Sequence, residues 1–265
     1  MRTPVPAHPC VSSAGVPRWF GLHGRLAGGL RRSQRPRNDI GQYDDLVVEW
    51  ERPNGKFAAL HWLAASRRAL VPQPSGPGEL LVDVGCGGGL LADERSGPYV
   101  HVGIDLVESA LRIACSRGLV PVRADVSMIP LNAGCASVVV AGEILEHVDD
   151  LDAVVGEICR VLRPGGTVVI DTISDTRRAK LALVAIAEHL PGGPPPRIHD
   201  PRLFVDPNRL TRLFRSNGVE LVVWGLRPSA WDYMRFLLDR QRAVRMLPIS
   251  SVALVYQGVG RKAVA

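Results

Sequence analysis

The feature that most constrains this chain is a short apolar run that ends in a glycine-rich turn. Leu81-Val82-Asp83-Val84 is followed directly by Gly85-Cys86-Gly87-Gly88-Gly89. A turn with so few side chains lets the backbone approach a ligand closely and permits positive φ angles. In an open α/β sheet, the first turn from strand to helix lies at the carboxyl edge of the strands, where ligands bind. We therefore expect an α/β sheet with a ligand site at this turn.

Strand and helix patterns alternate along the chain. Apolar runs predict strands at 80–84, 100–104, 119–123, 136–141 and 167–173. Helical spacing of apolar residues predicts helices at 108–117 and 151–162, and a helical pattern at 38–71 precedes the first strand. Later segments predict helices at 181–189 and 207–216 and strands at 219–224 and 252–257. The alternation predicts a doubly wound, mostly parallel sheet of Rossmann-like type, with N-terminal helices and a helical lid insertion at about 175–206.

The chain divides into a basic arm and one large domain. Residues 1–37 hold seven arginines and no acidic residue, whereas residues 38–265 are enough to bury a full core. We expect the arm to be mostly disordered and to have no catalytic role. An arginine-rich, acid-poor start is also typical of a transit peptide, and such a segment can lie on an anionic membrane.

Composition excludes several classes of protein. No apolar run approaches the roughly 18 residues that span a bilayer. The formal net charge is +6, but aromatic residues make up 5% and no basic stripe is interleaved with them, so no nucleic-acid partner is expected. The five cysteines are scattered and lack a C-x-x-C pair, which indicates neither a disulfide framework nor a zinc site. We expect a cytoplasmic protein, or one peripheral to a membrane.

Acidic residues stand where predicted strands end. Asp83 lies near the end of the first strand, Asp105 ends the second and Asp125 follows the third. A carboxylate at the end of the second strand can accept hydrogen bonds from both hydroxyls of a ribose. Asp125 is then placed to meet an adenine amino group. Each acid could instead cap a helix. Capping, however, does not explain the glycines Gly85, Gly87 and Gly89, or why the acids stand at the ends of successive strands.

Three motifs in order make the chain similar to class I S-adenosylmethionine (SAM)-dependent methyltransferases. They are Val82-Asp83-Val84-Gly85-Cys86-Gly87-Gly88-Gly89, Gly103-Ile104-Asp105 and Leu162-Arg163-Pro164-Gly165-Gly166. The glycine spacing is G-x-G-x-G, which differs from the G-x-G-x-x-G of dinucleotide sites. The resemblance covers roughly residues 80 to 173, implies the class I methyltransferase fold, and favours SAM over NAD as cofactor.

The flanking segments resemble one family within this class, the 3-demethylubiquinol 3-O-methyltransferases. The likeness rests on Tyr43 to Arg67, on Gly142 to Val148, and on His199-Asp200 with the residues after it. By position, the SAM contacts of that family fall on Arg67, Gly85, Asp105 and Gly142. The chain departs from the family pattern at Ala64, Ala65 and Gly142, and little similarity continues beyond Asn217, which leaves the substrate open.

Two carboxylates and an imidazole follow the fourth predicted strand. Glu143, Glu146 and His147 would share one face if they lay on one helix, since their offsets are three and four. Such a set can ligate a divalent ion such as Mg²⁺, which would hold a catechol and lower the pKa of its hydroxyl. If no ion binds, His147 or His199 is the candidate general base.

A basic start, Arg177 to Lys180, precedes an apolar helix that ends before Pro191. This segment is either a buried helix over the active site or a lid that touches an anionic membrane. The expected function is methyl transfer from SAM to a phenolic or catechol oxygen of a small molecule, in keeping with a quinone precursor. The alternatives are a methyltransferase of the same fold that acts on carbon, nitrogen or another hydroxyl, and a SAM-binding subunit without activity.

Overall fold

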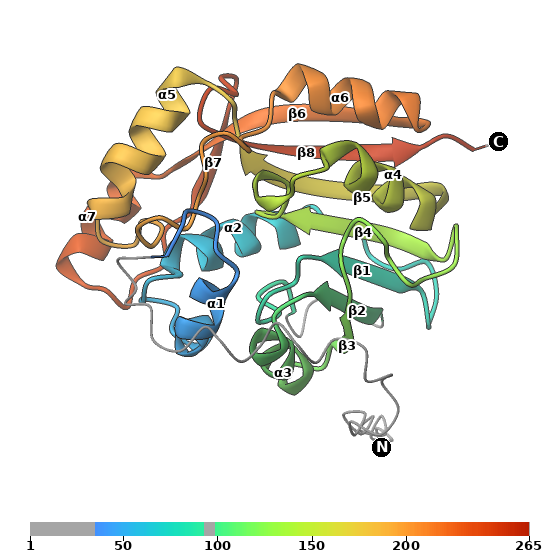
Figure 1. Ribbon diagram of the computed structural model, residues 1–265, viewed down its shortest axis with the longest axis horizontal. Helices are drawn as coiled ribbons and strands as arrows, with labels where there is room; N and C mark the ends of the chain where they lie inside the picture. Colours follow the sequence, from blue (N-terminus) through green and yellow to red (C-terminus); the bar gives the residue numbers. More distant parts are fainter. Residues whose placement is uncertain (1–34, 93–98, 265) are drawn as a thin grey trace. The chain divides into compact units, whose positions relative to one another are not determined.

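The computed structural model describes residues 35–92 and 99–264. The predicted arm lies almost wholly outside these residues. Residues Pro36–Ala265 form one compact unit built on a single eight-stranded sheet of order β3-β2-β1-β4-β5-β8-β6-β7 (Figure 1). Pairing from β3 to β5 is parallel, and β8 then runs antiparallel between β5 and β6. This is the Rossmann-like sheet that the alternation of patterns predicts.

The strands and helices follow the predicted segments closely. The strands are β1 (Leu80–Val84), β2 (Val100–Asp105), β3 (Val120–Arg123), β4 (Ala136–Gly142), β5 (Leu162–Ile173), β6 (Val219–Pro228), β7 (Met246–Ile249) and β8 (Val255–Lys262). The α-helices are α1 (Gly41–Asp45), α2 (Ala58–Arg68), α3 (Glu108–Ser116), α4 (Leu151–Val161), α5 (Arg177–Ala179), α6 (Pro207–Ser216) and α7 (Ala230–Leu238). Shorter turns are η2 (Val47–Glu51), η4 (Leu145–His147), η5 (Lys180–Ile186) and η6 (Ala187–His189).

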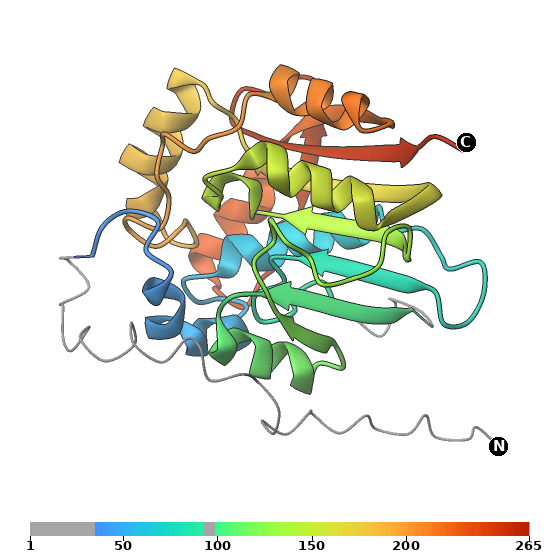
Figure 2. The same ribbon diagram turned by 45° about the vertical axis from the view of Figure 1, so that its right-hand side comes forward.

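The two faces of the sheet bury different helices because side chains alternate along each strand. In β1, Val82 and Val84 pack in the core that holds α4 and α6, whereas Leu81 packs on the opposite face. Figure 2 shows α4 and α6 in front of the sheet and α2 behind it. With both faces covered, the central strands are apolar throughout, as expected for a parallel sheet.

Some predicted boundaries are wrong. The predicted helix at 151–162 ends at Val161, and the strand predicted at 167–173 begins at Leu162, directly after α4. No sequence pattern predicted α7 and β7. Both lie beyond Asn217, where the apolar residues of α7 occupy more than one face and so give no clear period.

The lid insertion continues from α5 into a π-helical turn, η5, and then η6. It is not a buried helix: Leu181 is 62% and Ile186 50% exposed, although Leu183 on the same turn lines a cavity. Within the described parts of the chain, no helix has the length and apolar character needed to cross a membrane.

Capping of α6 provides a test of the fold. The Asp206 carboxylate accepts hydrogen bonds from the backbone N–H groups of Asn208 and Arg209, at 2.6 and 3.0 Å. We expect Asp206→Ala to lower the free energy of unfolding by about 1 kcal/mol, because two N–H groups lose their acceptor. Urea unfolding measures this, and Asp206→Ser, which can still cap, should retain most of the stability. Equal losses in both variants would contradict the capping role.

Candidate functional site

A cavity of about 460 Å³ opens at the carboxyl ends of β1, β2 and β4. The N-terminal helices and the lid close it from the other side. Ten of the twelve predicted site residues line it, and Gly89 and Glu146 do not. The ten are Arg67, Asp83, Gly85, Gly87, Asp105, Asp125, Gly142, Glu143, His147 and His199. The fold therefore gathers residues that are far apart in the sequence at one sheet edge.

The glycine turn has the conformation that its composition predicts. Gly85 and Gly87 have φ angles of +71° and +50°, a region that residues with a Cβ rarely adopt. A Cβ on Gly85 would lie 2.6 Å from the Ile144 side chain, and one on Gly87 would lie 2.3 Å from the Trp50 ring. The turn thus needs glycine for its backbone angles and for the close approach of both neighbours.

Asp105 fixes this turn to the end of β2. One carboxylate oxygen accepts a hydrogen bond from the Gly87 N–H and the other from the Val107 N–H, both at 2.8 Å. Burial raises the pKa of Asp105, which those backbone donors oppose. Asp83 lies 3.6 Å from the His101 ring, and Asp125 accepts hydrogen bonds from the backbone and hydroxyl of Ser127. All three acids face the cavity.

Arg67 reaches the cavity from α2 through a buried ion pair. Its Nη1 lies 2.6 and 2.7 Å from the two carboxylate oxygens of Asp171 in β5. The guanidinium packs against Gly142, where a Cβ would lie 2.3 Å from it. The departure from the family pattern at Gly142 therefore has a physical reason, because no larger residue fits beside Arg67 in this arrangement.

Two buried glutamates flank that ion pair. Burial, followed by the charges of Glu146 and Asp171, raises the pKa of Glu143 well above its ordinary value. Burial also raises the pKa of Glu146 to about 7, although Glu146 accepts a hydrogen bond from the Thr172 hydroxyl at 2.7 Å. Both carboxyls thus hold protons more strongly than carboxyls in water do.

His147 is held in a defined orientation. Its Nδ1 lies 2.5 Å from Oδ1 of Asn38, whose amide nitrogen donates to the His147 carbonyl at 3.0 Å. Because an amide oxygen only accepts, Nδ1 carries the proton and Nε2 has the lone pair. Nε2 lies 3.3 Å from the Tyr43 hydroxyl. Burial lowers the pKa of His147 to about 4, so the ring is neutral near pH 7.

His199 comes from the lid and stacks on His147, with ring centroids 5.2 Å apart. Its side chain is buried, and its Nδ1 has no hydrogen-bond partner. Burial, and then the charges of His147 and Arg37, hold its pKa well below the usual value. The two predicted base candidates therefore lie together, one on the sheet edge and one on the lid.

The expectation that Glu143, Glu146 and His147 share a helix face is wrong. Glu143 has a φ of +53°, so the chain turns there instead of entering a helix, and only Leu145–His147 forms a 3₁₀ turn. Among the described residues, the one group of three metal-ligating side chains is Glu146, His147 and His199, with ligand atoms within 4.8 Å of one another. His199, and not Glu143, lies next to Glu146 and His147 in this group.

Several residues of the site carry no sequence signal. Asn38 and Tyr43 contact His147 from the N-terminal segment, and Asp171 and Thr172 contact site residues from β5. Asp171 directly follows the apolar run Val168-Val169-Ile170, and an acid at this point of a strand could have marked it. The Asn38 contact could not be foreseen, because it joins segments 109 residues apart.

Comparison with known proteins identifies the family. A model of the methyltransferase domain matches residues 82–170. The ubiquinone biosynthesis O-methyltransferase of Cupriavidus pinatubonensis is 34% identical over 194 residues, covering 69% of this chain and 78% of that protein. The enzyme of the same name from Ralstonia nicotianae is 35% identical over 193 residues, covering 69% and 80%. The chain belongs to the ubiquinone biosynthesis O-methyltransferase family. It is a SAM-dependent O-methyltransferase, as the motifs predict.

Solved structures confirm the class I methyltransferase fold. A possible histamine N-methyltransferase of Thermotoga maritima matches with a TM-score of 0.59 at 16% identity, covering 84% of this chain and 95% of that one. Phosphoethanolamine N-methyltransferase 2 of Haemonchus contortus, in complex with SAM, matches with a TM-score of 0.58 at 13% identity, covering 85% and 59%. At such low sequence identity, these matches show the fold alone.

The buried Glu146 makes stability depend on pH. Since folding raises its pKa from 4.5 to about 7, the folded protein binds more protons, and this contribution to the free energy of unfolding is lost as pH rises through that interval. Between pH 5 and pH 8, this contribution should lower the free energy of unfolding of the wild type by an amount on the order of 3 kcal/mol. We expect this decrease to be absent in Glu146→Gln. Urea unfolding of both proteins at each pH measures the difference.

Comparing the two proteins cancels the opposite pH trend of His147, whose pKa is lowered. Glu108→Gln, at an exposed position of α3, is the matched control and should keep the wild-type pH dependence. The same dependence in wild type and Glu146→Gln would show that Glu146 does not carry it.

Proposed function

We propose that this enzyme transfers the methyl group of SAM to a phenolic or catechol oxygen of a quinone precursor. The observation that carries the proposal is the neutral, oriented His147 in the same cavity as the glycine turn and Asp105. The names of the relatives support ubiquinone biosynthesis as the setting. The sequence alternatives, transfer to carbon or nitrogen or binding without activity, gain no support from this geometry.

The cofactor roles follow from position. Gly85 and Gly87, together with Gly89 at the end of the turn, would let the backbone approach SAM. Asp105 and Asp125 would accept hydrogen bonds from the ribose and the adenine, since both acids line the cavity at the ends of neighbouring strands. Asp83, Arg67 and Gly142 line its other end, where Arg67 can meet the carboxylate of the methionine part.

The transfer needs one proton to leave the acceptor oxygen. In the proposed step, Nε2 of His147 takes the phenolic proton while the oxygen forms a bond to the methyl carbon and the carbon–sulfur bond of SAM breaks. S-adenosylhomocysteine and the methyl ether leave, and the proton passes from His147 to solvent. Asn38 holds the ring through Nδ1 during this step, and the Tyr43 hydroxyl, which lies beside Nε2, has to give way to the acceptor hydroxyl. His199, stacked on His147, is the alternative base.

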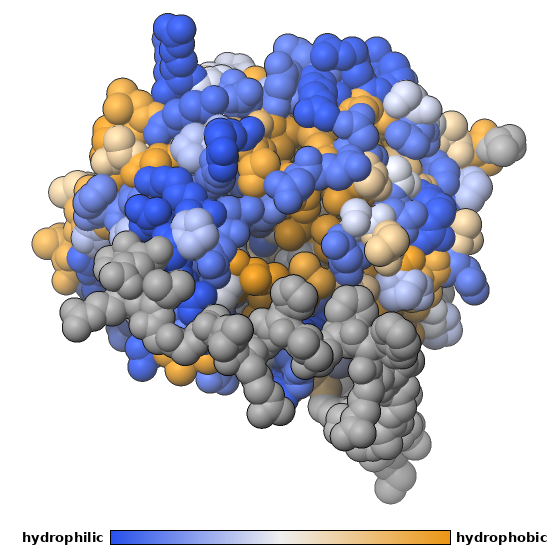
Figure 3. Space-filling view, in the orientation of Figure 1, coloured by the Kyte–Doolittle hydropathy of each residue, from blue (hydrophilic) through white to orange (hydrophobic). Residues whose placement is uncertain are grey.

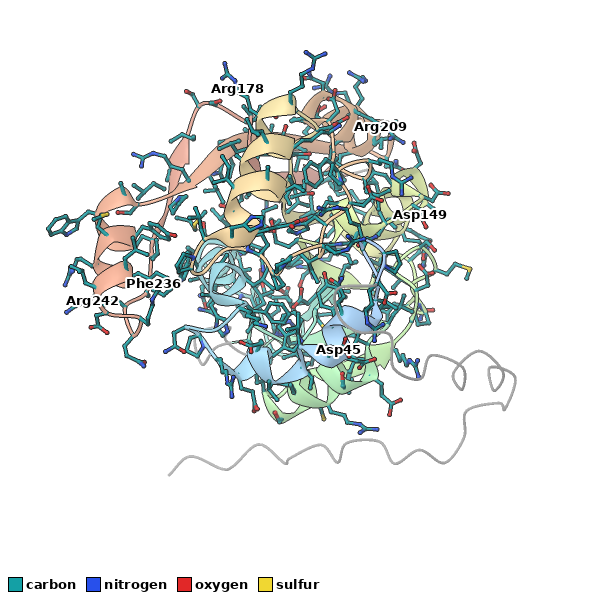
Figure 4. The ribbon with its side chains drawn as sticks, turned by 60° about the vertical axis from the view of Figure 1, so that its left-hand side comes forward. Asp45, Asp149, Arg178, Arg209, Phe236 and Arg242 are labelled. Carbon is teal, nitrogen blue, oxygen red and sulfur yellow. The ribbon has the colours of Figure 1, made fainter. Side chains whose placement is uncertain are left out.

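The lid supplies an apolar side to the cavity. Leu183, Pro194 and Ile198 line it, opposite Leu60 and Leu63 of α2. Such a lining suits a prenylated acceptor. On its outer side the lid exposes Leu181 and Ile186 beside the basic residues Arg177 and Arg178, and Figure 4 shows Arg178 projecting from its start. We propose that this segment, 177–190, touches an anionic membrane, where such acceptors reside.

A metal-assisted route is a second candidate, because Oε1 of Glu146 and Nδ1 of His199 are buried without a hydrogen-bond partner. With His147 they would hold one ion. One carboxylate and two imidazoles suit Zn²⁺ or Mn²⁺ better than the Mg²⁺ expected from the sequence, which prefers oxygen ligands. A bound ion would act as a Lewis acid toward the acceptor oxygen.

Transfer of labelled methyl from SAM to soluble catechols tests the function. We expect activity, and a fall in kcat of about a hundredfold or more in His147→Ala, because the base is lost. His189→Ala, at an exposed position of the lid, is the matched control and should remain active. Absence of transfer to any catechol would overturn the proposed acceptor class.

Adding a chelator to the same assay separates the two routes. Activity that persists with chelator supports the histidine base. Activity that is lost with chelator and returns with Zn²⁺ or Mn²⁺, but not in Glu146→Gln, supports the ion.

The role of Asp105 is tested by SAM binding. Asp105→Asn keeps the shape of the side chain but removes its charge, so we expect SAM affinity to fall by roughly ten- to a hundredfold. Isothermal titration calorimetry measures it, and Asp152→Asn, at the exposed start of α4, should bind as wild type. Unchanged affinity in Asp105→Asn would place the ribose elsewhere.

A further inference from the structure

Helix α7 has apolar side chains on two opposite faces. Phe236 is buried against Trp62 of α2, with ring centroids 5.0 Å apart. The opposite side exposes Trp231 (69%), Met234 (55%) and Leu238 (87%), which stand three and four residues apart. Apolar residues on the solvent side of a surface helix are unusual, because that side normally carries polar residues. The exposed side of α7 is therefore an uncovered apolar surface.

Exposed arginines stand on α7 and in the segments next to it. Arg227 and Arg235 are exposed on and beside the helix, Arg240 lies over the Phe236 ring, and Arg242 pairs with Asp239. Figure 4 shows Phe236 turned toward the body of the domain and Arg242 pointing away from it. The second acid of this region, Asp232, is neutralised by Arg245 at 2.6 Å. The surface therefore combines a large apolar area with net positive charge.

The covered side of α7 packs on the lid of the cavity. The Tyr233 hydroxyl donates a hydrogen bond to the Pro191 carbonyl at 3.0 Å, and Gly192 packs so closely on Phe236 that a Cβ would lie 3.0 Å from its ring. The lid exposes Leu181, Ile186 and Leu190. Figure 3 shows apolar side chains along the edge of the molecule where the lid and α7 lie in Figure 1.

We propose that α7 docks on an anionic lipid surface, with Trp231, Met234 and Leu238 among the acyl chains and the arginines at the headgroups. Tryptophan and arginine suit this boundary, because each joins an apolar body to a polar end. A second copy of the chain is the less favourable occupant, since a two-fold contact would bring the same arginines face to face. The inference extends the membrane contact of the proposed function from the lid to a second element.

Docking through α7 would also bring the lid of the cavity toward the membrane. Pro194 and Pro195 line the cavity and follow directly after the lid segment that contacts α7. With α7 on the membrane, the lid segment that packs on α7 lies near the lipid, which would shorten the path of an acceptor with a long apolar tail to the cavity. This consequence rests on the proposed acceptor, whereas docking itself does not.

Sedimentation of the full chain with vesicles tests the inference. Wild type should bind vesicles of phosphatidylcholine with phosphatidylglycerol more tightly than vesicles of phosphatidylcholine alone. We expect Trp231→Ser/Leu238→Ser to weaken binding to the anionic vesicles roughly tenfold or more, because two apolar side chains no longer insert. Arg235→Gln should weaken binding to anionic vesicles only. Val222→Ser, at an exposed apolar position of β6, is the matched control and should bind as wild type.

Three results would overturn the proposal. They are absence of wild-type binding, equal binding by wild type and the double variant, and a wild-type dimer that the double variant dissociates in analytical ultracentrifugation. The midpoint of urea unfolding, measured in parallel, should be close to that of wild type in the double variant, which shows that it is folded. Loss of vesicle binding with intact folding supports docking, and this outcome is independent of whether the proposed acceptor is correct.

Discussion

The buried ion pair between Arg67 and Asp171 is the interaction on which the site depends. It joins α2, which precedes the sheet, to β5 in its centre, and both side chains are almost completely buried. Removing one partner of such a pair leaves an uncompensated charge in the interior, which is strongly destabilising. The pair therefore fixes the N-terminal helices over the carboxyl ends of the strands, and these helices form one wall of the cavity.

The ion pair lies in a region where burial controls the pKa values of the acids. Burial raises the pKa of Asp171, and the charge of Arg67 only partly offsets this. Further acids in the same low-dielectric region can then ionise only at a cost, which explains the raised pKa values of Glu143 and Glu146. Gly142 is part of the arrangement, since only a residue without a side chain leaves room for the guanidinium.

The N-terminal segment and the lid meet at His147 and His199. Asn38 bonds to His147 through its side chain and to the Arg197 carbonyl through its backbone N–H, at 3.2 Å. Arg37 bonds to the His199 carbonyl and to Glu188 of the lid. The ring orientation in the site thus depends on contacts that the lid also makes, so movement of the lid and the geometry of the base are coupled.

The sequence by itself determined the parallel strands from β1 to β5, the helices between them and the glycine turn at their carboxyl ends. These depend on local patterns: apolar runs, a glycine turn, and acids such as Asp105 at strand ends. Tertiary structure alone decided the surroundings of His147. The positive φ of Glu143 turns the chain away from the predicted helix, and packing brings His199 beside Glu146 and His147. The spacing of residues in the sequence predicts neither the turn at Glu143 nor the position of His199. Both depend on how the lid and the N-terminal segment fold back over β4. The exposed face of α7 is likewise a product of packing, since the tertiary fold alone decides which of its apolar sides is covered.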